Sequence, residues 1–236
     1  MRSLIVMAMF AASLAGASWD EYTETRELEL AVDGIELLDI DAGAGSIEIR
    51  GDTNATRIQV KAVIRIPNAE KDDARKMIDS NLRLELVKIR SKASLQAYFD
   101  HDSWRSDDSA TVDLEIQVPH GLAIFVDDGS GPLKIEGSAG AIGIDDGSGS
   151  IDVRDAASVK IDDGSGSIRI VQVSCDVFVE DGSGDITVRE VGGTVTIDDG
   201  SGGIYVDDVE NDLVIVDDGS GSLQLSDIRG AVHRGD

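Results

Sequence analysis

Pairs of acidic residues recur through the second half of the chain at a spacing that suits cation binding. The segment Asp-Asp-Gly-Ser-Gly occurs six times, once with Glu as the first acid, in steps of 18, 17, 18, 18 and 19 residues. Calcium prefers sites that supply several carboxylate and carbonyl oxygens. If the copies stack in register, the predicted calcium ligands are the first acids of the pairs: Asp127, Asp145, Asp162, Glu180, Asp198 and Asp217.

The same acids have a second interpretation that needs no metal. Two like charges ~4.8 Å apart repel by ~0.9 kcal/mol in bulk water. A protein relieves this repulsion by turning one acid of each pair toward backbone amides, or by leaving the acids in solvent. The calcium-binding β-roll is also a poor match, because Ile151 stands where its glycine-rich repeat requires an Asp. Calcium binding and turn chemistry therefore both stay open.

A second candidate site lies in the single segment from Tyr98 to Asp108, which brings aromatic, histidine and acidic residues together. An aromatic platform beside carboxylates can stack a sugar ring, and an Asp-His-Asp triplet can supply metal ligands. The residues predicted to bind are Asp100, His101, Asp102 and Trp104. A polar hairpin loop is the alternative. An enzyme active site would also have to lie here, because a catalytic site is singular and the other acids recur six times.

Cys175 is the only cysteine, so no disulfide can form within the chain. It continues the alternation of Val177 and Val179, which predicts a small buried thiol. Pairing with a cysteine of another chain is the alternative.

Two short runs of alternating apolar residues in each repeat would position the acid pairs. Each run is typical of a half-buried strand, and Gly-Ser-Gly is typical of a corner where backbone angles with positive φ are needed. The first runs give the inward pairs Leu133/Ile135, Ile151/Val153, Ile168/Ile170, Ile186/Val188, Ile204/Val206 and Leu223/Leu225. The second runs give Ile124/Val126, Ile142/Ile144, Val159/Ile161, Val177/Val179, Val195/Ile197 and Val214/Val216. A further inward column holds Ser138, Ala156, Val173, Val191, Val209 and Ile228. One outward column is mixed and holds Phe125, Gly143, Lys160, Phe178, Thr196 and Ile215.

One such unit buries too little apolar surface to fold alone, so the repeats must stack. The sequence predicts an all-β fold, a parallel β-solenoid (β-helix) with rungs of about 18 residues. Asp41 to Ile49 has the same spacing as a repeat, so rungs also occur in residues 18–121, before the DDGSG repeats of residues 122–236. An insertion interrupts these early rungs. It is predicted to hold one short helix capped by Asn68 and running to about Ser80, with Ala74, Met77 and Ile78 on one face.

Strands are expected after that helix, from Leu82 to Phe99 and from Thr111 to Val118. The insertion elaborates the early rungs, so residues 18–121 and 122–236 are expected to form one continuous domain.

Residues 1–17 have the pattern of a signal peptide: Arg2, an apolar stretch from Leu4 to about Ala12, and small residues before a cut at Ser18. No long apolar run follows, so no membrane span is expected in the exported chain, which would be periplasmic, secreted or at the cell surface. The formal net charge of −25 makes nucleic acid and anionic membrane poor partners.

Three features of the sequence are typical of one bacterial family: the segment Gly45-Ser46-Ile47-Glu48-Ile49, the Val118-Pro119 step before Leu122, and the tandem repeats beyond. On these features the chain resembles the bacterial putative-adhesin β-strand-repeat family. The resemblance covers most of residues 28 to 232. It implies a solenoid of unknown function on an exported protein, with no catalytic residues and no cofactor.

The predicted function is that of a non-catalytic cell-envelope or surface scaffold, an adhesin-like protein that binds an unknown protein or glycan ligand. The alternative is a calcium-dependent binding module that uses the Asp ladder, and the third possibility is an enzyme acting on envelope polysaccharide. A last strand begins at Ala231-Val232 and leaves an edge that predicts possible end-to-end self-association.

Overall fold

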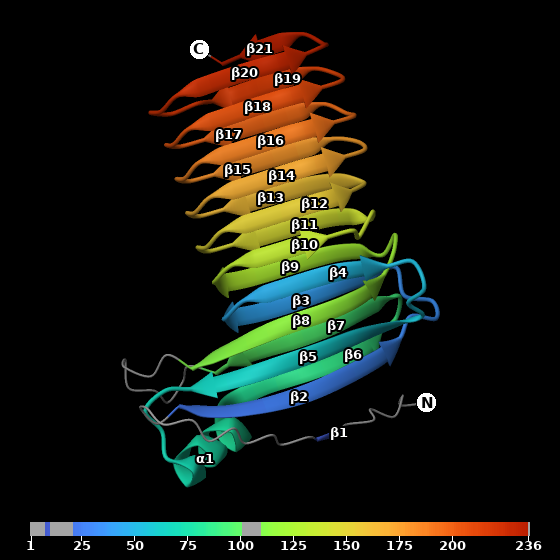
Figure 1. The fold of residues 1–236 in the computed structure, drawn as a ribbon, viewed down its shortest axis with the longest axis vertical. Coiled ribbons are helices and arrows are strands. Elements are labelled where there is room, and N and C mark those ends of the chain that lie inside the picture. The colour runs from blue at the N-terminus through green and yellow to red at the C-terminus, as the bar shows by residue number, and fades with distance from the viewer. Residues whose placement is uncertain (1–7, 10–20, 101–109, 236) are drawn as a thin grey trace.

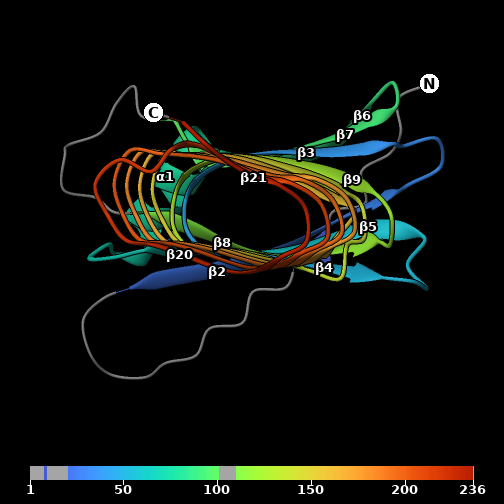
Figure 2. The same cartoon turned by 90° about the horizontal axis from the view of Figure 1, so that it is seen from above.

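The computed structural model describes residues 8–9, 21–100 and 110–235, and within them the fold is all-β apart from one helix. The strands form two large, mostly parallel sheets, one of eleven strands and one of ten. Seen from above, the two sheets face each other and are joined at both sides by turns (Figure 2). Of the predicted signal peptide, residues 1–17, only Ala8–Met9 is described, and the rest of it lies outside the described residues.

The first sheet contains, in spatial order, β1 (Ala8–Met9), β2 (Tyr22–Ala31), β5 (Arg57–Ile66), β8 (Thr111–Pro119), β4 (Ile47–Asp52), β10 (Leu133–Glu136), β12 (Ile151–Ala156), β14 (Ile168–Val173), β16 (Ile186–Val191), β18 (Ile204–Val209) and β20 (Leu223–Ile228). The second contains β21 (Val232–Arg234), β19 (Leu213–Asp217), β17 (Val195–Asp199), β15 (Val177–Asp181), β13 (Ser158–Asp163), β11 (Ala141–Asp146), β9 (Ala123–Ser130), β3 (Leu37–Ala44), β7 (Lys92–Phe99) and β6 (Leu82–Ile89).

From β9 onward, consecutive strands alternate between the two sheets, and each pairs in parallel with the strand two positions later (Figure 1). One step along a sheet therefore equals one sequence repeat, as in the pairing of Ile151 with Ile168 and of Val159 with Val177. This register brings equivalent residues of successive repeats side by side, ~4.8 Å apart.

The apolar pairs predicted to point inward lie buried between the sheets for every repeat before the last. The additional inward column is also confirmed: Ser138, Ala156, Val173, Val191 and Val209 are buried, and Ile228 is half-buried. These side chains form one continuous apolar core, which holds the two sheets face to face.

In the last repeat the pair Leu223/Leu225 keeps the predicted register, but the prediction of Val214/Val216 as the other inward pair is wrong by one residue. Val216, predicted to point inward, is 47% exposed, and Leu213 and Ile215 are buried instead. Leu213 pairs with Val195 and Ile215 with Ile197, and a register shift after Ile197 accommodates the longer 19-residue step. A slip of one residue turns every side chain of a strand to the opposite face, so Ile215 also leaves its predicted outward column.

Cys175 is exposed, in contrast to the predicted buried thiol. It lies in the corner between β14 and β15, where its backbone amide donates to the carbonyl oxygen of Ala157 at 2.8 Å. The inward alternation of β15 begins only at Val177, so the pattern does not extend back to the cysteine.

The insertion builds onto the same two sheets. Strand β5 pairs antiparallel with β2 on one side and with β8 on the other, and β6 and β7 form an antiparallel hairpin. Parallel pairing joins these additions to the repeats, because β4 lies between β8 and β10, and β3 lies between β7 and β9. The predicted strand from Leu82 to Phe99 is thus two strands, β6 and β7.

Helix α1 spans Lys71–Asn81 and lies at the end of the stack formed by β2 and β6 (Figure 1). Its N-cap is Glu70, so the predicted cap at Asn68 is wrong. Asn68 has φ of 55° and forms the turn that precedes the helix. Ala74 and Ile78 are buried and Met77 is half-buried, as the predicted apolar face requires. No helix in the described part of the chain has the length and apolar character that a membrane crossing requires.

Candidate functional site

The acid pairs separate into two columns at one corner of the stack. The first acids, here called the outer acids, lie in register in the second sheet, where Asp145 pairs with Asp127 and Asp162, and Glu180 with Asp162 and Asp198. Their side chains are exposed or half-buried, and the column continues to Asp217. The predicted stacking of these six residues is therefore present, on the outside of the molecule.

The second acids of the first five pairs, here called the inner acids, point into the molecule. Asp128 follows Ile124 and Val126 in strict alternation, so all three side chains face the interior. The inner acids are between 0% and 5% exposed, and they are Asp128, Asp146, Asp163, Asp181 and Asp199. Direct pairing of successive members makes them a continuous column of buried carboxyl groups.

Each inner acid except Asp128 is held by a local turn. Oδ1 of Asp146 accepts a hydrogen bond from the amide of Ser148 at 3.2 Å, and the same bond recurs from Ser165 to Asp163 at 3.1 Å. Asp181 and Asp199 accept equivalent bonds at 3.0 Å. The other carboxyl oxygen of each of these four has no hydrogen-bond partner among the described residues, and neither oxygen of Asp128 has one. The predicted turn chemistry therefore satisfies only half of each carboxyl group.

Burial and mutual repulsion make the inner acids hard to ionise. Burial, and secondarily the neighbouring Asp146, raise the pKa of Asp128 to about 7, although the amides of Ser130 and Gly129 oppose the shift. Burial also raises the pKa values of Asp146 and Asp181 to about 6, with a contribution from the stacked acids beside them. Burial is also the main reason why the pKa values of Asp163 and Asp199 are raised.

Glycines shape the corner beside the acids. Gly166 has φ of 147°, and a Cβ atom built there would lie 1.5 Å from the carbonyl oxygen of Gly149 in the preceding repeat. Gly184 and Gly202 stand in equivalent positions with the same close approach. The second glycine of the Gly-Ser-Gly segment is therefore required twice, by backbone conformation and by the packing of one repeat on the next.

Neither predicted binding set is assembled into a metal centre by the described side chains. In residues 8–9, 21–100 and 110–235, no three His, Cys, Asp or Glu side chains converge in a way that could hold a metal ion. Calcium binding by the outer acids stays a prediction. Of the second predicted set only Asp100 is described: its amide donates to Asn81, and it accepts a bond from Arg83 at 3.3 Å. His101, Asp102 and Trp104 lie outside the described residues.

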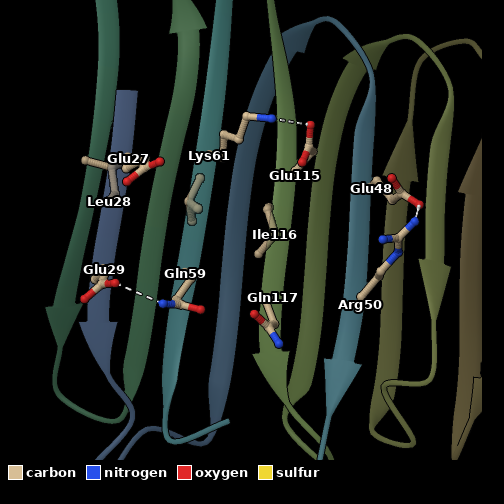
Figure 3. Close-up of a pocket in the computed structure, with 11 residues that line it drawn as sticks. Glu27, Leu28, Glu29, Glu48, Arg50, Gln59, Lys61, Glu115, Ile116 and Gln117 are labelled. Carbon is tan, nitrogen blue, oxygen red and sulfur yellow. Dashed lines mark hydrogen bonds and ion pairs between the residues drawn. The ribbon is translucent and has the colours of Figure 1, made fainter. Parts of the chain in front are cut away.

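A polar groove of about 430 Å³ crosses β2, β5, β8 and β4. The polar side chains along it bond to each other, as Figure 3 shows for Lys61 with Glu115 and for Glu29 with Gln59. Arg50 pairs with Glu48 in the same way at 2.6 Å. A ligand here would have to break these bonds before it formed its own.

A second groove, of about 470 Å³, lies on the outer face of the second sheet. We call it the apolar groove. Its outward-facing residues come from β9, β11, β13 and β15, and the central ones are Phe125, Gly143, Lys160 and Phe178. Phe125 is 37% exposed, and the ammonium of Lys160 lies 5.4 Å from the ring centre of Phe178.

The sequence placed these four residues in one outward column but gave no reason to single them out, because the column as a whole is mixed. The sequence feature that could have indicated the groove is a phenylalanine, Phe125, at the same position as a glycine, Gly143, in the next repeat. The exact register between repeats makes them neighbours.

Comparisons with known proteins give structural neighbours only. No protein-family model matches the chain, and no curated protein matches it. A putative cell adhesion protein from Clostridium sporogenes is 10% identical, with a TM-score of 0.32, over 92% of this chain and 99% of that one. A putative lipid binding protein from Parabacteroides distasonis is 11% identical, with a TM-score of 0.41, over 91% and 95%.

A putative adhesin from Parabacteroides distasonis is 12% identical, with a TM-score of 0.30, over 89% of this chain and 97% of that one.

Proposed function

We propose that this chain is an exported, non-catalytic binding protein, an acidic β-solenoid that acts as an adhesin-like scaffold in the cell envelope or at the cell surface. The alternation of consecutive strands between two facing sheets supports the solenoid, since one turn of the chain then adds one strand to each sheet. The first seventeen residues support export.

The apolar groove is the observation that carries the binding role. The outer faces of both sheets are rich in charged side chains, and an exposed phenylalanine beside small residues stands out from them. Exposed aromatic side chains in a depression of a polar surface are typical of binding sites. The formal charge of −25 favours a neutral or basic ligand over an anionic one.

Binding to envelope material tests this function. Fluorescently labelled full chain, as exported, is incubated with envelope fragments from the producing cells and sedimented at physiological salt. We expect saturable binding that excess unlabelled protein displaces. Non-saturable sedimentation, or none, contradicts the proposal.

A calcium-dependent binding module is the second candidate, and the stacked outer acids favour it. Asp127, Asp145 and Asp162 lie on adjacent strands ~4.8 Å apart, and the pKa of Asp127 is raised, first by burial and then by repulsion from Asp145. A divalent cation between outer acids would relieve this repulsion. The test is the melting temperature with millimolar calcium, with magnesium and with chelator. A rise specific to calcium, abolished in Asp145→Asn, supports the module, and an unchanged melting temperature contradicts it.

A further inference from the structure

The apolar groove has a flat floor between two aromatic side chains. Phe125, Gly143, Lys160 and Phe178 pair in register across four neighbouring strands. The parallel outward column beside them holds only small side chains at its first three positions: Ala123, Ala141 and Ser158. Phe125 and Phe178 are three strand spacings apart, ~14 Å. The groove is therefore long and shallow, and it is walled by an aromatic ring near each end.

Gly143 makes room for the ring of Phe125. A Cβ atom at this position would lie 2.9 Å from Cδ2 of Phe125, so the ring reaches across the glycine. Any larger residue would push the ring away. Gly143 has no left-handed backbone angle to explain it, so its physical role is to leave room for the Phe125 ring on the sheet.

Groups that can form hydrogen bonds border the aromatic side chains. The ammonium of Lys160 lies over Phe178, and Ser158 supplies a hydroxyl group on the same strand as Lys160. Asp176 lies in the lining at the Phe178 end, where its Oδ1 accepts a bond from the amide of Thr194 at 2.8 Å. A hydrogen-bond donor (Lys160), an acceptor (Asp176) and a hydroxyl group that can do both (Ser158) therefore lie beside the two aromatic rings.

We propose that the apolar groove binds a neutral glycan, with sugar rings stacked on Phe125 and Phe178. A sugar ring has one face of C–H groups, which suits an aromatic ring, and hydroxyl groups around its edge, which suit Ser158, Lys160 and Asp176. The excess of 25 negative charges disfavours acidic sugars. The ~14 Å between the strands that carry the two rings suits a short oligosaccharide better than a single sugar.

A protein partner fits the groove less well. A stable protein interface buries about 800 Å² on each side around a core depleted of charge. Here the exposed apolar surface is limited to the groove, and exposed charged residues such as Lys160, Asp145 and Asp162 lie among or beside its strands. The inference rests on the proposed binding function and names the ligand class for it.

Nuclear magnetic resonance provides the test. The ¹⁵N-labelled chain, as exported, is titrated separately with cellohexaose, chitohexaose and mannohexaose, and with hexagalacturonate as the acidic probe. We expect at least one neutral hexasaccharide to shift the amide signals of Gly143, Lys160 and Phe178 in a saturable way, and hexagalacturonate to bind more weakly. Shifts confined to other residues, or no saturable shift with any neutral probe, overturn the proposal.

Three variants assign the binding to the groove. Phe178→Ala should weaken binding of the neutral hexasaccharide by roughly tenfold or more. Gly143→Ala should weaken it by displacing the Phe125 ring while leaving both rings present. Tyr205→Ala is the matched control, because Tyr205 is an outward aromatic residue with a basic neighbour, Arg189 at 5.9 Å, on the other sheet. Its affinity should stay within about twofold of the unmodified chain.

The proposal is overturned if Tyr205→Ala loses as much affinity as Phe178→Ala while both variants keep the native amide spectrum. Binding to envelope fragments tests the proposed binding function, whereas binding of the hexasaccharides tests the ligand class, so the two can fail separately. If envelope binding persists while the neutral hexasaccharides fail, the glycan assignment is wrong and the binding function stands. If protease treatment of the envelopes abolishes binding, the partner is a protein.

Discussion

The acid pairs show how two adjacent acidic residues take different roles. The two acids of each pair are adjacent, so the pleat of the strand sends the first to solvent and the second into the core. Asp145 is exposed and Asp146 is 2% exposed on the same strand. The buried carboxyl keeps one hydrogen bond to a backbone amide and leaves the other oxygen unsatisfied, which favours the protonated form.

Stability should consequently fall as the pH rises through the pKa values of the inner acids. Their folded-state pKa values, about 6 for Asp146 and Asp181 and about 7 for Asp128, exceed the unfolded value of about 3.9. Their stabilising contribution is fully present below pH ~4 and is lost between pH ~4 and ~7. Urea unfolding at a series of pH values measures this decline.

Asp146→Asn separates the inner acids from the other carboxyl groups. The amide keeps an acceptor for Ser148 but cannot ionise, so this variant should be more stable than the unmodified chain at pH 8 and should flatten the decline. Asp145→Asn, at the adjacent outer position, is the control and should leave the slope between pH 4 and 7 nearly unchanged. An equal effect of both substitutions would show that overall charge, and not the buried column, sets the pH dependence.

The glycine corner makes a separate prediction at the residue scale. Gly166→Ala should lower the free energy of unfolding by more than about 2 kcal/mol, because it combines a left-handed backbone angle with overlap of a carbonyl oxygen. Gly121→Ala is the matched control, since φ is +86° there and nothing lies within 4 Å of the added Cβ. It should cost only about 1 kcal/mol, the backbone term alone. Equal losses would mean that contact between repeats contributes nothing.

At the scale of the strand, alternation predicts most of this fold and fails where two alternations are equally good. In β12, the polar residue Asp152 separates Ile151 from Val153, so only one register buries the apolar pair. In β19, Leu213, Val214, Ile215 and Val216 are all apolar, and period-2 reasoning cannot choose between the two faces. Pairing with β17 decides the register, and that pairing is a contact between distant residues.

The register of β19 can be tested by two matched truncations. Ile215→Ala should destabilise the protein by about 2 kcal/mol or more, because it removes buried methyl and methylene groups. Val216→Ala should change the free energy of unfolding by less than about 0.5 kcal/mol, because Val216 is 47% exposed. Urea unfolding measures both values, and the reverse order would restore the register that the sequence alone suggests.

The candidate site was predictable in part for the same reason. Stacking of the outer acids follows from the repeat length, and burial of the inner acids follows from the alternation Ile124, Val126, Asp128, which the sequence already contains. The apolar groove was not predictable, because it depends on which side chain each residue meets in the next repeat. The contact between Phe125 and Gly143 is invisible until the register between β9 and β11 is known.

At the scale of the whole molecule, the last strands of both sheets expose apolar side chains. Val216, Leu225 and Val232 are three of the large apolar side chains that the described chain leaves exposed, and they lie on β19, β20 and β21. β20 and β21 are edge strands of their sheets, and exposed edges can pair with another chain. This arrangement supports the proposed end-to-end self-association.

Self-association should appear as a mass that rises with protein concentration in sedimentation equilibrium. Leu225→Lys, which places a charge on the edge strand β20, should reduce the association without lowering the melting temperature, because Leu225 is 36% exposed. A monomer mass across the whole concentration range rules the association out.

The proposed function requires the outer face of the second sheet to be a binding surface. Saturation binding of the labelled chain to envelope fragments tests this, with the unmodified protein compared with the double variant Phe125→Ala/Phe178→Ala and the control Tyr205→Ala. We expect the double variant to lose roughly tenfold or more in affinity and the control to lose none. Equal affinity of all three proteins, with native spectra throughout, would place the binding surface elsewhere on the molecule.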